Sequence, residues 1–138
     1  MNKVVIYTDG VSRGNPGPGA IGAVIRDGNG NVLARISRTI GEVTNNQAEY
    51  QAVIAALKEA LALGARDVEI RSDSELIVNQ INGDYAVKKD RLKDLHQVVM
   101  HLMEEFDRFN AVSIPREENK EADRLASRAI RKPRPRPQ

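Results

Sequence analysis

The stretch that decides the fold is residues 3–40, which read KVVIYTDGVSRGNPGPGAIGAVIRDGNGNVLARISRTI. Apolar and polar residues alternate from Lys3 to Asp9, so this segment is expected to be a strand that ends at its acidic residue. A glycine- and proline-rich loop follows, and the apolar run from Ala20 to Ile25 fits a second strand. Turn residues 27–30 precede a third alternating run, residues 32–40. The pattern predicts a three-stranded antiparallel meander.

The rest of the chain alternates helices with strands. Thr44 and Gln47 form a capping-box pattern ahead of a helix that is expected to end at Gly64. A stripe of apolar residues three and four apart predicts an amphipathic helix from Asp90 to Phe109. The remaining expected elements are a strand over 67–72, a helix over 74–82, a strand over 111–114 and a helix from about Glu117. The resulting order, βββαβααβα, predicts an α/β fold with a mixed five-stranded sheet flanked by helices.

The composition is that of a globular domain. The chain has 138 residues, 41% of them hydrophobic and 29% charged, and it contains no cysteine. Disulfide scaffolds, thiol nucleophiles and thiolate zinc sites are therefore excluded. Apolar runs are too short to span a membrane, and the first residues lack the layout of a signal peptide. We expect a cytoplasmic protein with no membrane partner.

Charge is unevenly distributed along the chain. Residues 1–123 carry 15 basic and 19 acidic side chains, whereas residues 124–138 carry 6 basic side chains and no acidic one. We therefore divide the chain into a domain, residues 1–131, and an Arg/Pro-rich tail, residues 132–138. Alternating proline blocks helix in the tail and favours an extended arm. Such an arm either neutralises phosphates or only solubilises the chain.

Four acidic residues lie at the ends of predicted elements. They are Asp9, Glu49, Asp73 and Asp123. Sites in open α/β sheets form outside the carboxyl ends of strands, so these side chains are candidates to converge there. Converging carboxylates repel one another unless a cation neutralises them, and hard oxygen ligands suit Mg²⁺ or Mn²⁺. The alternative is that each acid is simply solvated at the surface.

The glycine-rich loop, residues 14–19, lacks the Lys-Ser/Thr ending of a nucleotide-binding P-loop. Its backbone amides are still able to approach the phosphates or sugars of a polymer. The alternative is a plain connection between two strands.

A set of short motifs, each on the element expected for it, carries a resemblance to a known family. The motifs are Thr8-Asp9-Gly10, Gly14-Asn15-Pro16-Gly17-Pro18-Gly19, Thr44-Asn45-Asn46-Gln47-Ala48-Glu49, Ser72-Asp73-Ser74 and Asn119-Lys120-Glu121-Ala122-Asp123-Arg124-Leu125-Ala126. Together they resemble ribonuclease H type 1, in particular members without the basic protrusion. The resemblance extends from about Lys3 to Ile130 and implies a ribonuclease H-like fold.

The resemblance implies a metal-dependent endonuclease that cuts the RNA strand of RNA–DNA hybrids. By similarity, Asp9, Glu49, Asp73 and Asp123 are the catalytic, metal-binding carboxylates, with the backbone of Gly10 beside them. Two Mg²⁺ ions, which Mn²⁺ is expected to replace, fit the general two-metal scheme. The expected products carry a 5′ phosphate and a 3′ hydroxyl.

The resemblance also implies a set of substrate-binding residues along the minor groove of the hybrid. They are Gly10, Ser12, Asn15, Thr44, Asn45, Asn46 and Glu75. Contacts to the 2′-hydroxyl are expected to select RNA, and Thr44 is expected to help hold a phosphate of the DNA strand. Asn45 and Asn46 have an alternative interpretation as helix caps.

The sequence departs from the family pattern in two places. Many members have a histidine in the loop before the last acid, and Arg116 is the nearest substitute here, since His96 and His101 belong to the predicted long helix. In place of a basic protrusion, we expect an electrostatic contribution from Lys88 and Lys89 and from Arg134 and Arg136 in the tail.

Two rival functions stay open at this stage. One is a hybrid-binding module that no longer cuts, and the other is a relative of the same fold that acts on DNA. The expected partner is an RNA–DNA hybrid; we expect a monomer with no obligate protein partner.

Overall fold

The computed structural model describes residues 3–131, so the predicted tail, with Arg134 and Arg136, lies outside the described residues. The elements are β1 (Lys3–Ser12), β2 (Gly17–Asp27), β3 (Val32–Val43), α1 (Asn45–Ala62), β4 (Asp67–Ser72), α2 (Glu75–Ile81), α3 (Asp90–Met103), β5 (Arg108–Ser113), the 3₁₀ turn η1 (Arg116–Glu118) and α4 (Lys120–Arg131). Within these residues no helix is both long and apolar enough to cross a membrane.

The strands form one sheet in the order β3-β2-β1-β4-β5. Strand β1 is central: it pairs antiparallel with β2, placing Asp9 opposite Gly22, and parallel with β4, placing Thr8 opposite Ser72. Strand β5 extends the parallel half. The predicted α/β fold with a mixed five-stranded sheet is confirmed. Because β1 and β4 are parallel, their carboxyl ends lie at the same edge of the sheet.

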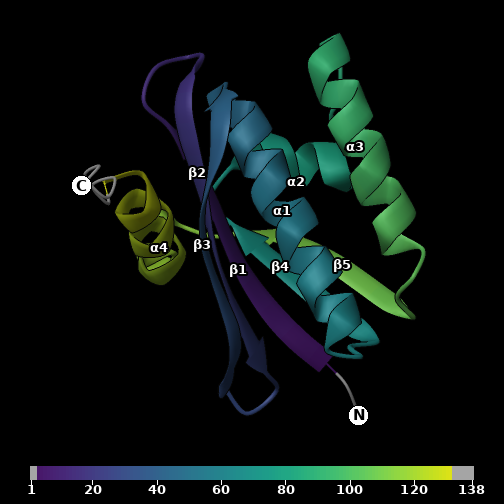
Figure 1. Ribbon diagram of the computed structural model, residues 1–138. Helices are drawn as coiled ribbons and strands as arrows, with labels where there is room; N and C mark the ends of the chain where they lie inside the picture. The colour runs from purple at the N-terminus through teal and green to yellow at the C-terminus, as the bar shows by residue number, and fades with distance from the viewer. Residues whose placement is uncertain (1–2, 132–138) are drawn as a thin grey trace.

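Helices cover both faces of the sheet (Figure 1). Helix α1 crosses one face, with α2 and α3 beside it, and α4 lies against the other face over β2 and β3. Alanines along the buried side of α1, among them Ala52, Ala56 and Ala60, let this helix approach the sheet closely. Ile6, Ile70 and Leu57 are fully buried in the core between them.

The long amphipathic helix is shorter than the sequence predicts. It ends at Met103 rather than Phe109, and β5 begins at Arg108 rather than at residue 111. The backbone N–H groups of Asp107 and Arg108 both donate to the carbonyl of Arg66, which starts the pairing of β5 with β4. Phe106 is still buried, but it lies in the turn after α3. Its spacing from the apolar residues of α3 therefore indicated a buried position correctly and a helical one wrongly.

Other boundaries shift by a few residues. The predicted end of the first strand at Asp9 is wrong, because β1 continues to Ser12 through its pairing with β2. The loop after it shrinks to residues 13–16, because the glycines after Pro16 pair with β1 and β3 as part of β2. The last helix begins at Lys120 rather than near Glu117, since η1 occupies the preceding residues and Glu118 N–H donates to the carbonyl of Pro115.

Candidate active site

Three of the four predicted acids lie together at the carboxyl edge of the sheet. Carboxylate oxygens of Asp9, Glu49 and Asp73 all lie within 4.8 Å of one another. Asp9 comes from the central strand and is only 6% exposed; Glu49 comes from the second turn of α1, and Asp73 directly follows β4. We call these three side chains the acid cluster. The topology therefore brings together residues that are up to 64 positions apart in the sequence.

Gly10 fixes the position of Glu49 in the acid cluster. The Gly10 N–H donates a hydrogen bond to Glu49 Oε1 at 2.9 Å. A Cβ atom at residue 10 would lie 2.2 Å from the carbonyl carbon of Ala48, far inside van der Waals contact. Only glycine at this position lets the first turns of α1 lie against β1, so the backbone approach and the orientation of Glu49 depend on the same residue.

Asp73 is held in the junction between β4 and α2. Ser72 Oγ accepts a hydrogen bond from the Ser74 N–H at 3.1 Å, and Ser74 Oγ accepts one from the Ile77 N–H at 3.3 Å. Ser74 is thus the N-cap of α2, and the acid lies between two serines that fix the turn. The strand end and the helix start together determine where the Asp73 carboxylate lies.

The fourth acid, Asp123, lies beside the cluster on the first turn of α4. Asn119 Nδ2 donates to the backbone oxygen of Thr8 at 2.8 Å, in a buried contact that anchors the start of α4 to β1. The Asp123 N–H in turn donates to the carbonyl of Asn119 at 3.1 Å. The negative charge of Asp123 lies close enough to Asp9 and Glu49 to raise the pKa of both.

The charges of the acid cluster are costly in the absence of a cation. Burial raises the pKa of Asp9 to about 9, and the negative charges of Glu49, Asp73 and Asp123 act in the same direction. Burial also raises the pKa of Glu49 to about 8, against the opposing effect of the Gly10 hydrogen bond. No basic side chain among residues 3–131 forms an ion pair with these acids. A close set of carboxylate oxygens without a protein counter-charge fits a hard divalent cation such as Mg²⁺ or Mn²⁺.

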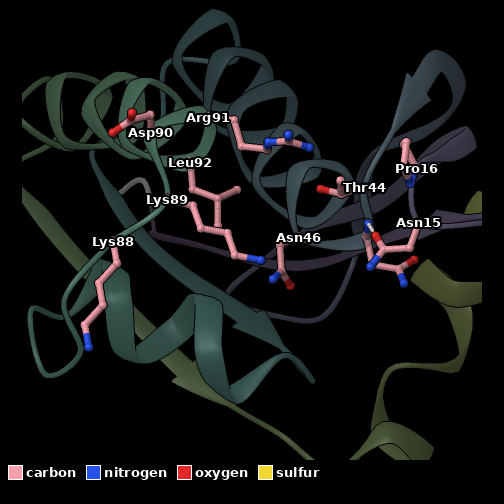
Figure 2. Close-up of a pocket in the computed structure, with 10 residues that line it drawn as sticks. Asn15, Pro16, Thr44, Asn46, Lys88, Lys89, Asp90, Arg91 and Leu92 are labelled. Carbon is pink, nitrogen blue, oxygen red and sulfur yellow. Dashed lines mark hydrogen bonds between the residues drawn. The ribbon is translucent and has the colours of Figure 1, made fainter.

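A second region, which we call the basic cleft, has a volume of about 870 Å³. It is lined by Asn15, Pro16, Thr44, Asn45, Asn46, Lys88, Lys89, Asp90, Arg91 and Leu92. In Figure 2 the Lys89 side chain points toward Asn46 and the Arg91 side chain toward Thr44, whereas Lys88 points away. The cleft therefore joins the start of α1 to the start of α3. Its cations and amide groups suit a polyanion such as a nucleic-acid backbone.

Four of the predicted substrate-binding residues, Asn15, Thr44, Asn45 and Asn46, line the basic cleft. Thr44 is the N-cap of α1, with the full capping box to Gln47, so Asn45 and Asn46 belong to the first helical turn and their interpretation as caps is wrong. Asn15 Oδ1 accepts a hydrogen bond from the Asn45 N–H at 3.0 Å. Loop 13–16 is thereby tied to the start of α1.

The remaining predicted residues lie around these two regions. Ser12 Oγ donates to the carbonyls of Val43 and Gly14, and so holds the same loop from the other side. Glu75 is exposed in the first turn of α2, and Arg116 is exposed in η1. His101 is exposed on α3, whereas His96 Nε2 lies 3.1 Å from the carbonyl oxygen of Gln80. Neither histidine belongs to the acid cluster.

Sequence reasoning missed Gln80 and two residues that line the basic cleft, Asp90 and Leu92. Gln80 is a buried polar residue within an apolar helix face formed by Ile77, Val78 and Ile81. A glutamine inside an apolar stripe is a detectable signal, because a buried amide needs hydrogen-bond partners. Asp90 and Leu92 give no comparable signal in the sequence.

Comparison with known proteins now decides the family. A family model described as "Reverse transcriptase-like" matches residues 7–129. Ribonuclease HI of Halobacterium salinarum is 42% identical over 93% of this chain and 64% of its own length. The chain belongs to the ribonuclease H family. The resemblance noted from the motifs is therefore confirmed.

Solved structures of ribonuclease H proteins share the fold. The ribonuclease H1 structure of H. salinarum superposes with a TM-score of 0.91 and covers 93% of this chain and 97% of that chain. LC11-RNase H1, isolated from compost by a metagenomic approach, is 50% identical with a TM-score of 0.89, covering 94% of this chain and 96% of that chain. LC11-RNase H1 has also been solved in complex with an RNA/DNA hybrid.

The family domain also occurs within longer proteins. The N-terminal ribonuclease H domain of Rv2228c from Mycobacterium tuberculosis is 44% identical, with a TM-score of 0.90, and covers 93% of this chain and 98% of that domain's chain. The match spans only 35% of the whole bifunctional protein Rv2228c. The chain thus corresponds to the ribonuclease H part of that relative.

Proposed function

We propose that this chain hydrolyses the RNA strand of RNA–DNA hybrids endonucleolytically, with two divalent cations, and leaves 5′-phosphate and 3′-hydroxyl ends. The observation that carries the proposal is the acid cluster, which lies at the carboxyl edge of the sheet with a basic cleft formed in part by the same helix, α1. The hybrid complex of LC11-RNase H1, which is 47% identical to this chain in that structure, supports the class of substrate.

Asp9, Glu49, Asp73 and Asp123 hold the cations in this proposal. Mg²⁺ is the expected ion, and Mn²⁺ substitutes for it because both prefer oxygen ligands. When bound, two such cations supply an activated water and stabilise charge on the departing 3′ oxygen. The chain's own contribution is to fix the carboxylates on a central strand, a helix and a strand end, with Gly10 orienting Glu49 through its backbone. No protein nucleophile is needed.

The basic cleft and its surroundings hold the hybrid in this proposal. Thr44, Lys88 and Lys89 contact phosphates of the DNA strand. The groups that contact the minor groove and the 2′-hydroxyls of the RNA strand are Gly10, Ser12, Asn15, Asn45, Asn46 and Glu75. The hydrogen bond from Asn45 N–H to Asn15 Oδ1 supports this role, because it orients the Asn15 amide nitrogen as a donor.

Further parts of the proposal concern residues away from the two regions. Arg116, in the turn before α4, takes the position of the loop histidine of other members and assists turnover. Arg134 and Arg136 in the tail add electrostatic attraction to the hybrid. The chain works as a monomer, because its own residues supply all four carboxylates. The cytoplasmic location expected from the sequence stays a prediction.

A cleavage assay tests the proposed function. The full chain is incubated with a hybrid labelled on its RNA strand, with Mg²⁺ or Mn²⁺. Glu49→Gln or Asp73→Asn should lower cleavage by on the order of a thousandfold or more while hybrid binding stays measurable. Glu59→Gln is the matched control, since it makes the same change farther along α1. A wild-type chain that leaves the hybrid intact with every cation would contradict the proposal.

The same assay separates the two rival functions. Binding of the hybrid without cleavage would indicate a module that only binds. Cleavage of duplex DNA in preference to the hybrid would indicate a relative that acts on DNA. Preferential cleavage of the RNA strand of the hybrid, with duplex DNA left intact, supports the proposed enzyme.

A further inference from the structure

Gln80 is a buried polar residue at the centre of a hydrogen-bond network. It lies on α2 and is 5% exposed. Its side-chain oxygen Oε1 accepts a hydrogen bond from the Tyr50 hydroxyl at 2.7 Å, and its nitrogen Nε2 donates to the carbonyl oxygen of Ala86 at 3.3 Å. The backbone oxygen of Gln80 lies 3.1 Å from the ring nitrogen Nε2 of His96 on α3. One residue thus contacts three separate segments.

The two side-chain contacts join the regions that carry the proposed chemistry and binding. Tyr50 is fully buried on α1, immediately after Glu49 of the acid cluster. Ala86 lies in the connection between α2 and α3, two residues before Lys88 and three before Lys89. The Gln80 amide is therefore a direct bridge from the helix that holds Glu49 to the segment that holds the lysines of the basic cleft.

The connection has few other attachments at this point. Its first part is held by the Asp84 and Tyr85 N–H groups, which donate to the carbonyl of Asn79, and its last residue caps α3. Among the described residues, the bond from Gln80 Nε2 is the one hydrogen bond that reaches residues 86–88. Ala86 and Lys88 are exposed, and the half-buried Val87 between them is the residue of this stretch that packs against the core. A single apolar contact constrains the backbone on either side of it weakly.

We infer that Gln80 is a positioning residue, which sets where Lys88 and Lys89 lie relative to Glu49 by bridging Tyr50 to the backbone of Ala86. The inference rests on the proposed function for the importance of the two lysines to the hybrid. Gln80 belongs neither to the acid cluster nor to the basic cleft. Its role is to fix the position of one relative to the other. Loss of the bridge releases residues 86–88, so that Lys88 and the approach to Lys89 at the start of α3 are less ordered, and binding of the hybrid must then offset the entropy of ordering them.

The alternative is that Gln80 only fills space in the core, and this alternative predicts a different kinetic result. A residue that only packs the core affects stability and activity generally, and its effect is independent of Lys88 and Lys89. A positioning role raises KM more than it lowers kcat, and its effect depends on the two lysines being present. The two roles are therefore distinguished by coupling between substitutions.

The first measurement compares wild type with Gln80→Met, which keeps the volume but removes both side-chain hydrogen bonds. We expect KM for the hybrid to rise about five- to tenfold, in line with the loss of one or two hydrogen bonds, with kcat within about twofold. Trypsin cleavage after Lys88 and Lys89, followed by mass spectrometry, should accelerate in the free protein, because cleavage requires the connection to leave its folded position. An unchanged cleavage rate at both lysines would overturn the inference regardless of any activity.

The second measurement places Gln80→Met in a chain that already carries Lys88→Ala and Lys89→Ala. With the lysines absent, the extra rise in KM should fall below about twofold, because nothing remains to be positioned. A full, additive rise in KM would overturn the inference. If Gln80→Met fails to fold, Tyr50→Phe removes the other half of the bridge and takes its place in the same comparison, with the same two outcomes.

The wild-type chain separates this inference from the proposed function. If wild type neither binds nor cuts the hybrid, the proposed function fails and the positioning role fails with it. If wild type cuts the hybrid but the substitutions at residue 80 are uncoupled from the lysines, the positioning role alone fails.

Discussion

The acid cluster and the basic cleft are built in different ways. Asp9, Glu49 and Asp73 come from the central strand, the second turn of a helix and a strand end, and Asp9 is almost completely buried. The basic cleft is formed by a loop, two helix starts and a connection, and its lysines are exposed. The elements around the acid cluster are paired or packed on several sides, whereas the cleft depends on single hydrogen bonds such as those of Asn15 and Gln80.

The difference indicates how tolerant each region is to change. Carboxylates that must share cations need fixed positions, and regular elements packed around a core provide them. A polyanion is held by several long, flexible cations, so small displacements cost less at each contact. We therefore expect substitutions near the acid cluster to act through structure and chemistry together, and those in the cleft to act gradually through binding.

The largest expected effect is that of Gly10→Ala. The added Cβ would lie 2.2 Å from the carbonyl carbon of Ala48, so α1 must move away from β1. We expect the free energy of unfolding to fall by about 3 kcal/mol or more, with loss of cleavage as Glu49 is displaced. Chemical denaturation and the cleavage assay measure the two effects.

Gly28→Ala is the control, because nothing lies within 4 Å of a Cβ at that position. Its stability should stay within about 0.5 kcal/mol of wild type. An equal loss of stability in both variants would mean that the close approach of α1 to residue 10 is not what Gly10 provides.

The acid cluster should make the stability of the folded chain depend on pH. The pKa of Asp9 is about 9 and that of Glu49 about 8 in the folded chain, both above the values of about 4 typical of unfolded chains. Between these values the folded state binds more protons than the unfolded state, so stability falls as pH rises. Without divalent cations, we expect the melting temperature to be lower at about pH 8 than at about pH 5.5.

Asp9→Asn should reduce the fall in the free energy of unfolding between about pH 5.5 and about pH 8 by on the order of 2 kcal/mol. In wild type, added Mg²⁺ should raise the melting temperature more at the higher pH than at the lower. Asp27→Asn is the control, because the hydrogen bonds of Asp27 to Asn31 and Asn29 lower its pKa instead. If the fall with pH were the same in Asp9→Asn as in wild type, the acid cluster would not be its source.

Substitution of the cleft lysines should act on binding with little effect on stability. We expect Lys88→Ala with Lys89→Ala to weaken hybrid binding about tenfold and to reduce the slope of log K against log salt by about one to two. Titrations at several salt concentrations measure both. Lys58→Ala, an exposed lysine near the other end of α1, should leave the slope unchanged. An unchanged slope in the double variant would remove these lysines from the interface.

The smallest expected effect is that of the tail. Deleting residues 132–138 removes three basic side chains, Lys132, Arg134 and Arg136. We expect binding of the hybrid to weaken by about two- to threefold and its salt dependence to flatten slightly. Binding with an identical salt slope after the deletion would show that the tail only solubilises the chain.

Much of the fold follows from local pattern. Alternation in residues 3–9, the capping box at Thr44 and the strand-to-helix junction at Ser72–Ser74 each predict an element that the structure contains. Strand periodicity predicted that the first strand ends at Asp9, whereas β1 runs to Ser12; its parallel pairing with β4 nevertheless ends at Thr8 and Ser72, which explains why Asp73 joins Asp9. These features depend on neighbours in sequence or on simple topology, which a single sequence carries.

The features that were missed depend on tertiary contacts. The start of β5 depends on the carbonyl of Arg66, which is distant in sequence, and Phe106 has an apolar spacing that suits helix or turn equally. The role of Gln80 depends on Tyr50 and Ala86, which no periodicity connects to it. Likewise, Asp90 and Leu92 line a cleft only because loop 13–16 and the start of α1 lie opposite the start of α3.

The turn between β2 and β3 has a practical consequence. Asp27 pairs with Val4, so residues 28–31 project from the end of the sheet opposite the one that gathers the carboxylates. Asp9 lies five residue steps along the strand from Val4, a span of about 16 Å. A fluorophore or an affinity handle attached at Asn29 would therefore report on, or immobilise, the molecule while leaving the acid cluster and the basic cleft open.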